Sequence, residues 1–343
     1  MSVGRTGDAS DRDFWFDQGD WGIKLGYSSE DDYQSRYGNV YYGIDLNQKQ
    51  TNLLFSTSLS DDTVWNSYNP DVLLESPTQR NSRQKREWMF SINQIINRYT
   101  VVEAKLTHVQ QKGELSDPYK KSFVVDEGII DFRGLVDVAG LLTAFVDAGL
   151  IDFLNDSGIT RLLNQTPFID VPELSELFLG LYPDTRPSNR EQWILALRTS
   201  RHIPTLDSSI HLDYRYADDS WDANSHTLEV TWNWAIDGWI ISTGLRYYSQ
   251  SNAFFYATFH ETVPDHGAVS SDYRLAGFGA RSYKLAVHKT LRDRFILSAH
   301  LESYERRHQW QLGDPFHSSR NSVGDDLDDF KFTLFSVGID VLF

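Results

Sequence analysis

Two histidines lie beside carboxylates in the sequence, and such pairs can activate water for hydrolysis. Asp218 and Asp219 precede His226, while Glu302 lies two residues after His300. A protease built on a membrane barrel would need paired acids and a histidine together at one end of the fold. These spacings are not specific to that chemistry, so they do not by themselves predict a hydrolase.

A third histidine could serve a lipase that works from the lipid-facing side of a membrane barrel. The expected register places His108 on that side, but the neighbouring positions Trp193 and Leu195 supply no serine. A histidine without a nucleophile and an orienting partner is not a catalytic site. We therefore expect no enzyme activity and no cofactor, and a barrel lipase or protease stays a distant alternative.

Carboxylates also gather in short runs at 30–32, 218–219 and 325–329, which could hold calcium through several oxygen ligands. None has the spacing of a calcium-binding loop, so we expect solvated loops and predict no metal site. Calcium bridging to lipopolysaccharide stays open. Nearby basic residues such as Lys120 and Arg306 could pair with lipopolysaccharide phosphates.

Charged residues alternate with apolar ones in several segments, so the charges of each segment fall on one face. Arg198, Arg215 and Arg246 could offer a path for anions, because the arginine fork fits carboxylate and phosphate. Acids and bases are mixed on this face, so they could instead pair into a closed polar core. The residues predicted to line the lumen of a barrel are Lys24, Asp45, Glu103, Lys105, Arg198, His211, Asp213, Arg215, Glu229, Arg246, Lys284, His300 and Glu302.

The same alternation predicts the elements that position these residues. Trp21, Ile23 and Leu25 alternate with Gly22 and Lys24, which is typical of a strand with one apolar face. The segments reach the ~9–11 residues of a tilted membrane-crossing strand, whereas soluble strands average roughly 5–6 residues. Twelve strands are predicted, near 20–29, 36–46, 50–61, 86–96, 99–112, 191–202, 207–217, 225–235, 239–251, 273–290, 293–306 and 329–343.

The composition narrows the class of protein. Lys and Arg total 32 against 48 Asp and Glu, a net charge of −16 that argues against a nucleic-acid-binding surface. With no cysteine, the chain has no disulfide framework and no thiolate site. The mean hydropathy is −0.44, and no apolar run could form a membrane-spanning helix. A transmembrane β-barrel remains compatible, because alternating strands escape hydropathy scans.

The connections between the predicted strands alternate in length. Short periplasmic turns and long outer loops are typical of Gram-negative outer-membrane barrels. The long connections are 62–85, 113–190, 252–272 and 307–328. Because twelve is even, both ends are expected on the periplasmic side, with 1–19 as a periplasmic segment and 20–343 as the barrel. The first residues lack the apolar core of a signal peptide, so we expect a mature form.

The last nine residues alternate and end on an apolar side chain. The pattern resembles the recognition signal that the barrel-assembly machinery reads in outer-membrane barrels. The residues that fit this signal are Ser336, Gly338, Val341 and Phe343. We therefore expect the assembly machinery as a partner during biogenesis, and outer-membrane lipid and lipopolysaccharide as surroundings.

Residues 126–182 do not show the alternating pattern of the predicted strands. Apolar residues recur there at helical spacing, with Gly and Pro breaks. We expect three short amphipathic helices in an extracellular insert. Their apolar residues include Leu135, Leu141, Leu142, Phe145, Leu150, Phe153, Leu174 and Phe178. The insert could pack on itself as a cap, plug the lumen, gate an apolar substrate, or bind a partner protein, a second copy or lipid.

Four segments together resemble an uncharacterised family of Gram-negative outer-membrane barrels, called domain of unknown function 3570. The segments are 113–120 (GELSDPYK), 211–216 (HLDYRY), 245–251 (LRYYSQS) and 270–275 (SSDYRL). The resemblance covers roughly 35–290 and implies an outer-membrane barrel but no activity. The insert before Arg186 departs from the pattern, so any function special to this protein is expected there.

Taken together, these patterns predict an all-β protein with a single antiparallel barrel of about twelve strands and a small helical insert. The function that they favour is a membrane-anchored scaffold that docks a partner protein, or a second copy, through the insert. The alternative is a narrow and possibly gated pore for a small solute. Nucleic acid is not an expected partner.

Overall fold

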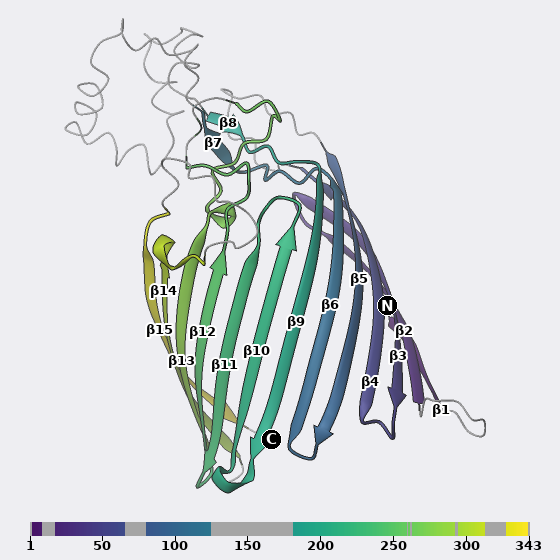
Figure 1. Ribbon diagram of the computed structural model, residues 1–343, viewed down its shortest axis with the longest axis vertical. Helices are drawn as coiled ribbons and strands as arrows, with labels where there is room; N and C mark the ends of the chain where they lie inside the picture. The colour runs from purple at the N-terminus through teal and green to yellow at the C-terminus, as the bar shows by residue number, and fades with distance from the viewer. Residues whose placement is uncertain are drawn as a thin grey trace, which may run out of the picture.

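The computed structural model describes residues 2–8, 18–65, 80–124, 181–258, 260, 263–291, 294–312 and 327–341. Within them, thirteen strands form one antiparallel sheet in chain order, and two short strands, β7 and β8, form a separate pair (Figure 1). The only helical elements among these residues are three 3-10 turns, Pro204–Leu206, Tyr273–Leu275 and His308–Trp310. None of them is a helix long and apolar enough to span a bilayer.

The strands of the sheet agree closely with the alternating segments of the sequence. They are β1 Ser2–Asp8, β2 Gln18–Ser29, β3 Tyr33–Leu46, β4 Thr51–Val64, β5 Asn81–Asn97, β6 Thr100–Gly113, β9 Asn189–Ile203, β10 Ser208–Asp219, β11 Ser225–Ile236, β12 Trp239–Gln250, β13 Phe278–Leu291, β14 Phe295–Arg307 and β15 Phe330–Val341. The short pair is β7 Lys121–Phe123 with β8 Leu181–Pro183.

Three boundaries differ from the prediction, and the first is β5, which begins at Asn81 and not at 86. Residues 2–8, expected in a segment outside the barrel, form β1 and pair along β2. The strand expected from 273 begins only at Phe278, because the Asp272 side chain accepts a hydrogen bond from the Arg274 backbone and starts a 3-10 turn. The helical insert predicted at 126–182 falls almost entirely outside the described residues, and so do its eight apolar residues.

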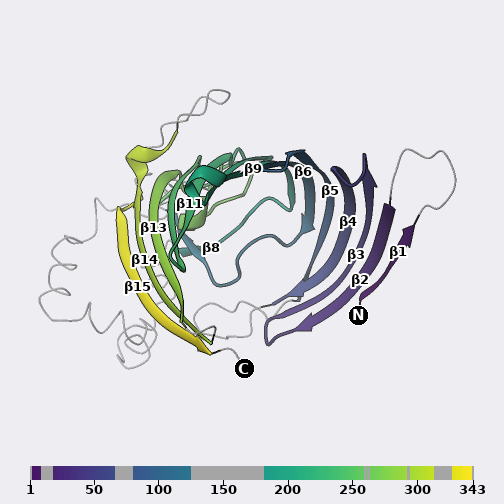
Figure 2. The same cartoon turned by 90° about the horizontal axis from the view of Figure 1, so that it is seen from below.

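The predicted closed barrel is not what the sheet forms. The sheet is strongly curved but open, with β1 and β15 as its two edges (Figure 2). Closure requires the two edges to meet at a matching tilt and stagger, and β1 offers seven residues to the twelve of β15. The curvature follows from the right-handed twist that accumulates across neighbouring strands.

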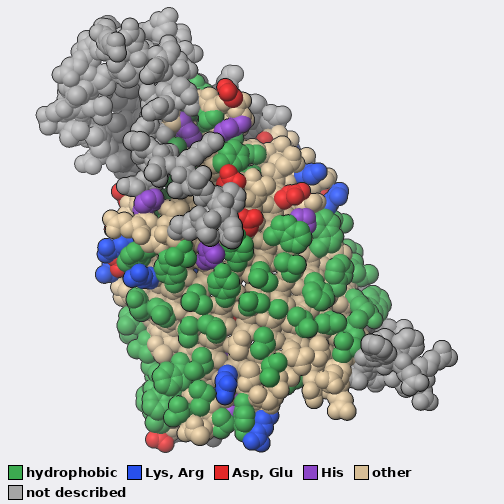
Figure 3. All heavy atoms as spheres, viewed as in Figure 1, with side chains coloured by type: hydrophobic (Ala, Val, Ile, Leu, Met, Phe, Trp, Pro, Cys, Tyr) green, Lys and Arg blue, Asp and Glu red, His purple; other side chains and the backbone are tan. Residues whose placement is uncertain are grey.

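The two faces of the sheet differ in chemistry. Large apolar side chains cover the convex face in a broad belt (Figure 3). The register aligns them from strand to strand, as in the row Leu212, Val230, Leu245 and Tyr283. Polar side chains take the alternate positions on the concave face, because side chains alternate along a strand.

The two ends of the sheet also differ. At one end, called the turn end here, consecutive strands join through tight turns that use left-handed backbone at Asn47, Asp207, Asp237 and Gly238. At the other, called the loop end, long connections fold over the sheet beside β7 and β8 (Figure 1). The main buried apolar cluster of the described residues lies in these connections, around Trp221 and Phe255.

Candidate functional site

The concave wall carries every residue that the sequence predicts in the lumen. One continuous register row crosses seven strands from β4 to β12. It consists of Asn52, Asn93, Glu103, Arg198, Asp213, Glu229 and Arg246, each opposite the next. Lys284 and Glu302 face each other in the adjacent part of the wall, and Ala286 faces His300. The charges therefore share one surface.

The wall charges pair only in part. On this face, Arg83–Asp62, Lys85–Glu87 and Arg190–Asp219 form ion pairs. Three further ion pairs form among the predicted lumen residues, namely Lys105–Glu103 at 3.5 Å, Arg198–Asp213, and Lys284–Glu229 at 3.4 Å between nitrogen and oxygen. Their side chains are partly exposed, so each pair stabilises the fold by no more than about 1 kcal/mol. Among the described residues, no carboxylate lies within ion-pair distance of Arg215 or Arg246. The wall is thus less fully paired than a closed polar core.

The two acid–histidine combinations of the sequence lie in different surroundings in the structure. Asp219 is buried and binds Arg190, with 2.8 Å between Nε and Oδ2. His226 instead lies on the convex face, where its Nδ1 is 2.9 Å from the Tyr214 hydroxyl. The ring of His300 packs at 5.0 Å against His288. Asp219 and His226 therefore lie on opposite faces of the sheet, whereas His300 and Glu302 share the concave face.

His108 lies in an aromatic stack on the convex face. Its ring centroid is 4.3 Å from that of Trp193 and 5.5 Å from that of Trp88. Trp and Tyr prefer membrane–water interfaces, so this stack fits an interfacial band. No cluster of three or more His, Asp or Glu side chains within the described ranges could hold a metal ion.

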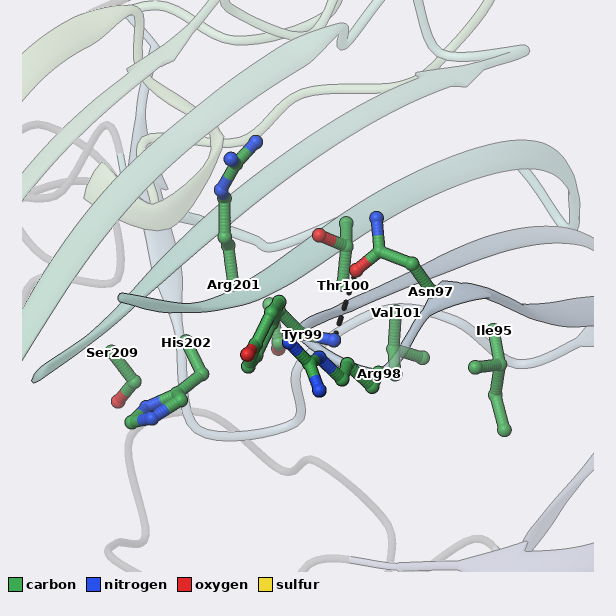
Figure 4. A pocket seen from close by; sticks show the side chains of 10 residues that line it. Ile95, Asn97, Arg98, Tyr99, Thr100, Val101, Arg201, His202 and Ser209 are labelled. Carbon is green, nitrogen blue, oxygen red and sulfur yellow. Dashed lines mark hydrogen bonds between the residues drawn. The ribbon is translucent and has the colours of Figure 1, made fainter. Parts of the chain in front are cut away.

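A hollow of about 440 Å³ lies at the turn end, where the β5–β6 turn meets β9 and β10. Arg98 packs on the Tyr99 ring at 4.5 Å, and the His202 backbone N–H donates to the Tyr99 carbonyl. Figure 4 shows Arg201 pointing away from Arg98. Because the two guanidinium groups do not converge, this hollow lacks the geometry of an anion site.

The loop end holds a partly buried network of charges, called the clamp here. It consists of Asp117, Asp184, Arg186, Asp272 and Arg274. Arg186 Nε donates to Asp184 Oδ2 at 2.6 Å, and its Nη2 donates to Asp272 Oδ2 at 2.9 Å. Arg274 binds both Asp272 and Asp117. The Asp184 and Asp272 side chains are fully buried, and Arg186 is 12% exposed.

The clamp fixes the two chain segments that enter and leave the insert. The strand before the insert, β7, pairs with the strand after it, β8. The Asp184 N–H donates to the Lys120 carbonyl at 3.1 Å, and Thr185 exchanges two backbone hydrogen bonds with Val269. In addition, the Ser271 N–H donates to the Ser122 hydroxyl at 3.0 Å. Both ends of residues 125–180 are therefore tied to the same folded loops.

The environment shifts the pKa values of two groups in these loops. Burial alone would raise the pKa of Asp272, but hydrogen bonds and charge from Arg274, with the charge of Arg186, outweigh burial and lower it. Burial lowers the pKa of His260 against a weaker opposing contact, in which its Nε2 lies 3.4 Å from the Ser270 carbonyl. Both shifts favour the forms that these groups take at pH 7, namely an ionised Asp272 and an uncharged His260.

The clamp was not predicted as a site. In the sequence, Asp117 and the run 270–275 served only as evidence of the family resemblance. The presence of both Asp and Arg in these segments could have indicated an ion pair between them. Of the predicted assembly signal, Ser336, Gly338 and Val341 lie in β15. Phe343 lies outside the described residues, and the role of the signal stays a prediction.

The chain resembles several solved structures and one protein family. Solved structures with a similar chain path include CdiB from Acinetobacter baumannii (12% identity, TM-score 0.41, covering 99% of this chain and 53% of that one) and BamA from Haemophilus ducreyi (10%, 0.39, 98% and 69%). OmpT from Vibrio cholerae is another (8%, 0.38, 99% of both). The chain thus spans about half the length of CdiB. No curated protein matches it. The model of one family, described as protein of unknown function (DUF3570), matches residues 5–317, so the chain belongs to that family.

Proposed function

We propose that the protein is an outer-membrane β-barrel of a Gram-negative bacterium, closed by its two edge strands within the bilayer. The apolar belt of the convex face supports this proposal, because such a belt is stable against lipid. The bilayer also favours closure of the sheet, because each unpaired backbone N–H or C=O group at an open edge costs on the order of several kcal/mol in hydrocarbon.

Within that location, the protein acts as a docking platform that presents the insert to a partner protein. The observation that carries this proposal is the clamp, which ties both flanks of residues 125–180 to a partly buried network. Breaking one partner of a buried ion pair costs about 3–5 kcal/mol, so the clamp holds the base of the insert stiffly. A preformed base reduces the ordering cost of binding.

Site-specific photo-crosslinking in cells tests the docking role. A photoreactive amino acid replaces Leu142 or Phe178 in the insert, and Leu195 on the convex face serves as the control. Docking predicts one discrete protein adduct from the insert positions, and loss of that adduct when Arg186→Ala breaks the clamp. Adducts of equal yield with and without Arg186→Ala, or none from the insert, would contradict it.

A narrow pore for small solutes is the second candidate. The incomplete pairing of the concave wall favours it, because Arg215 and Arg246 have no carboxylate in ion-pair range among the described residues. Single-channel conductance of the full chain and of a variant lacking 127–182 separates the possibilities. Conductance only in the shortened chain would make the insert a lid, and absence of conductance in both would exclude the pore.

A further inference from the structure

Three arginines and two tyrosines gather on one patch of the concave wall, between β10 and β14. In one register row, Arg215 aligns through Thr227 with Tyr248, and through Ala280 with Arg306. In the adjacent row, Arg246 aligns through Ser282 with Tyr304. Neighbouring strands lie about 4.8 Å apart and residues rise about 3.4 Å along a strand, so two strand spacings and a two-residue offset separate the backbones of Arg215 and Arg246 by roughly 12 Å.

Each of the two tyrosines in this patch lies near two of the arginines. The Arg246 guanidinium carbon lies 6.0 Å from the Tyr248 ring centroid. The charges of Arg246 and Arg215 both lie within Coulombic reach of the Tyr248 hydroxyl, and those of Arg306 and Arg246 reach the Tyr304 hydroxyl. Beneath them, Ala280 and Ser282 are only 3% and 5% exposed, so the larger side chains close over small ones.

Two donors in this patch lack acceptors. The Nε atoms of Arg246 and Arg306 are buried and form no hydrogen bond within the described part of the chain. The carboxylate opposite Arg246 is Glu229, which pairs with Lys284 at 3.4 Å. Buried charged donors nearly always have a partner in native proteins, because leaving them unsatisfied is costly. The patch therefore carries excess positive charge and unused donors.

We propose that this patch is a binding site for a small oxyanion of the phosphate or carboxylate class, held mainly by Arg246 and Arg215. The arginine fork matches two oxygens of such a group and makes charge-assisted hydrogen bonds to both. Gly244, two residues before Arg246 on the same face of β12, carries no side chain, and a Cβ there would lie in ordinary contact with Lys284 and Thr231. The site goes beyond the docking role and does not rest on it.

Calorimetric titration of the refolded full chain in detergent with inorganic phosphate at low ionic strength tests the site. Arg246→Gln and Arg215→Gln remove one cation each, and Arg201→Gln removes an exposed arginine at the turn end as the matched control. Gel mobility before and after heating shows that each variant is folded. We expect saturable binding, weakened at least tenfold by either wall substitution and less than twofold by Arg201→Gln.

Arg246→Lys refines the test, since it keeps the charge but loses the fork, and its affinity is expected between the wild type and Arg246→Gln. If Arg246→Gln fails to fold, Arg215→Gln and Arg246→Lys still carry the comparison. Absence of saturable binding in the wild type overturns the site. Equal weakening of phosphate binding by Arg246→Gln, Arg215→Gln and Arg201→Gln also overturns the site, because that result would reflect net charge alone. Neither result bears on docking.

Discussion

At the scale of single residues, the clamp depends on where five charged side chains meet. Two carboxylates are fully buried, and each is held by an arginine, so the charges are tolerated only in this arrangement. The partners Asp117 and Arg274 lie 157 residues apart in the sequence. The sequence analysis did not predict these contacts, because no local pattern shows that segments so far apart in the chain meet.

Arg186→Ala should open the loop end without unfolding the sheet. It leaves Asp184 and Asp272 buried without their shared cation, which costs about 3–5 kcal/mol. We expect proteolysis of the loops between β6 and β9 to accelerate by about a hundredfold, as mass spectrometry of the fragments would show. Arg98→Ala, an exposed position at the turn end, is the control and should leave the rate unchanged. Equal rates in the two variants would contradict the account.

Acid should loosen the same loops in two steps. Because folding lowers the pKa of His260, the unfolded form binds more protons below its ordinary value of 6.5, and stability falls as the pH drops through that range. The pKa of Asp272 is also lowered, so its contribution is lost only below about pH 3.8. Hydrogen exchange at residues 270–275 measures both steps. His260→Gln should remove the first step and keep the second, and retention of both would refute the assignment.

At the scale of elements, the alternation of side chains determines the strands, because a period of two is a local property of the sequence. This is why all twelve predicted segments reappear, and why the predicted wall residues share one face. The 3-10 turn at Tyr273–Leu275 escaped prediction, since a side-chain cap from Asp272 overrides the alternation there. The open edges of the sheet were also not predicted from the sequence, because barrel closure depends on strand tilt and stagger summed over all the strands.

Closure between the edges can be tested with cysteines, because the chain has none of its own. In one set of double variants, Val337→Cys on β15 is combined with Val3→Cys on β1. In a second set, it is combined with Ile23→Cys on β2. Each set also includes one neighbouring position on each strand, to cover the neighbouring registers. In membranes we expect a disulfide in one of these sets, since paired strands bring Cα atoms to about 5.5 Å. The pair of Val337→Cys with Leu195→Cys, far across the sheet, is the negative control. No disulfide in any edge set would argue for an open sheet.

At the scale of the whole molecule, the protein has three zones with different chemistry. The convex belt is apolar, the concave wall is charged, and the loop end is clamped around the flanks of the insert. In the proposed outer-membrane orientation, the belt would face lipid, the wall would face water, and the clamp would hold the base of the insert on the outer side.

Labelling of single cysteines in intact cells with a membrane-impermeant maleimide tests this orientation most directly. Leu142→Cys lies in the insert, Asn97→Cys at the turn end and Leu195→Cys in the apolar belt. The account predicts labelling of Leu142→Cys in intact cells, of Asn97→Cys only after the outer membrane is permeabilised, and of Leu195→Cys in neither case. Labelling of Asn97→Cys but not Leu142→Cys in intact cells, or equal labelling of all three, would contradict it.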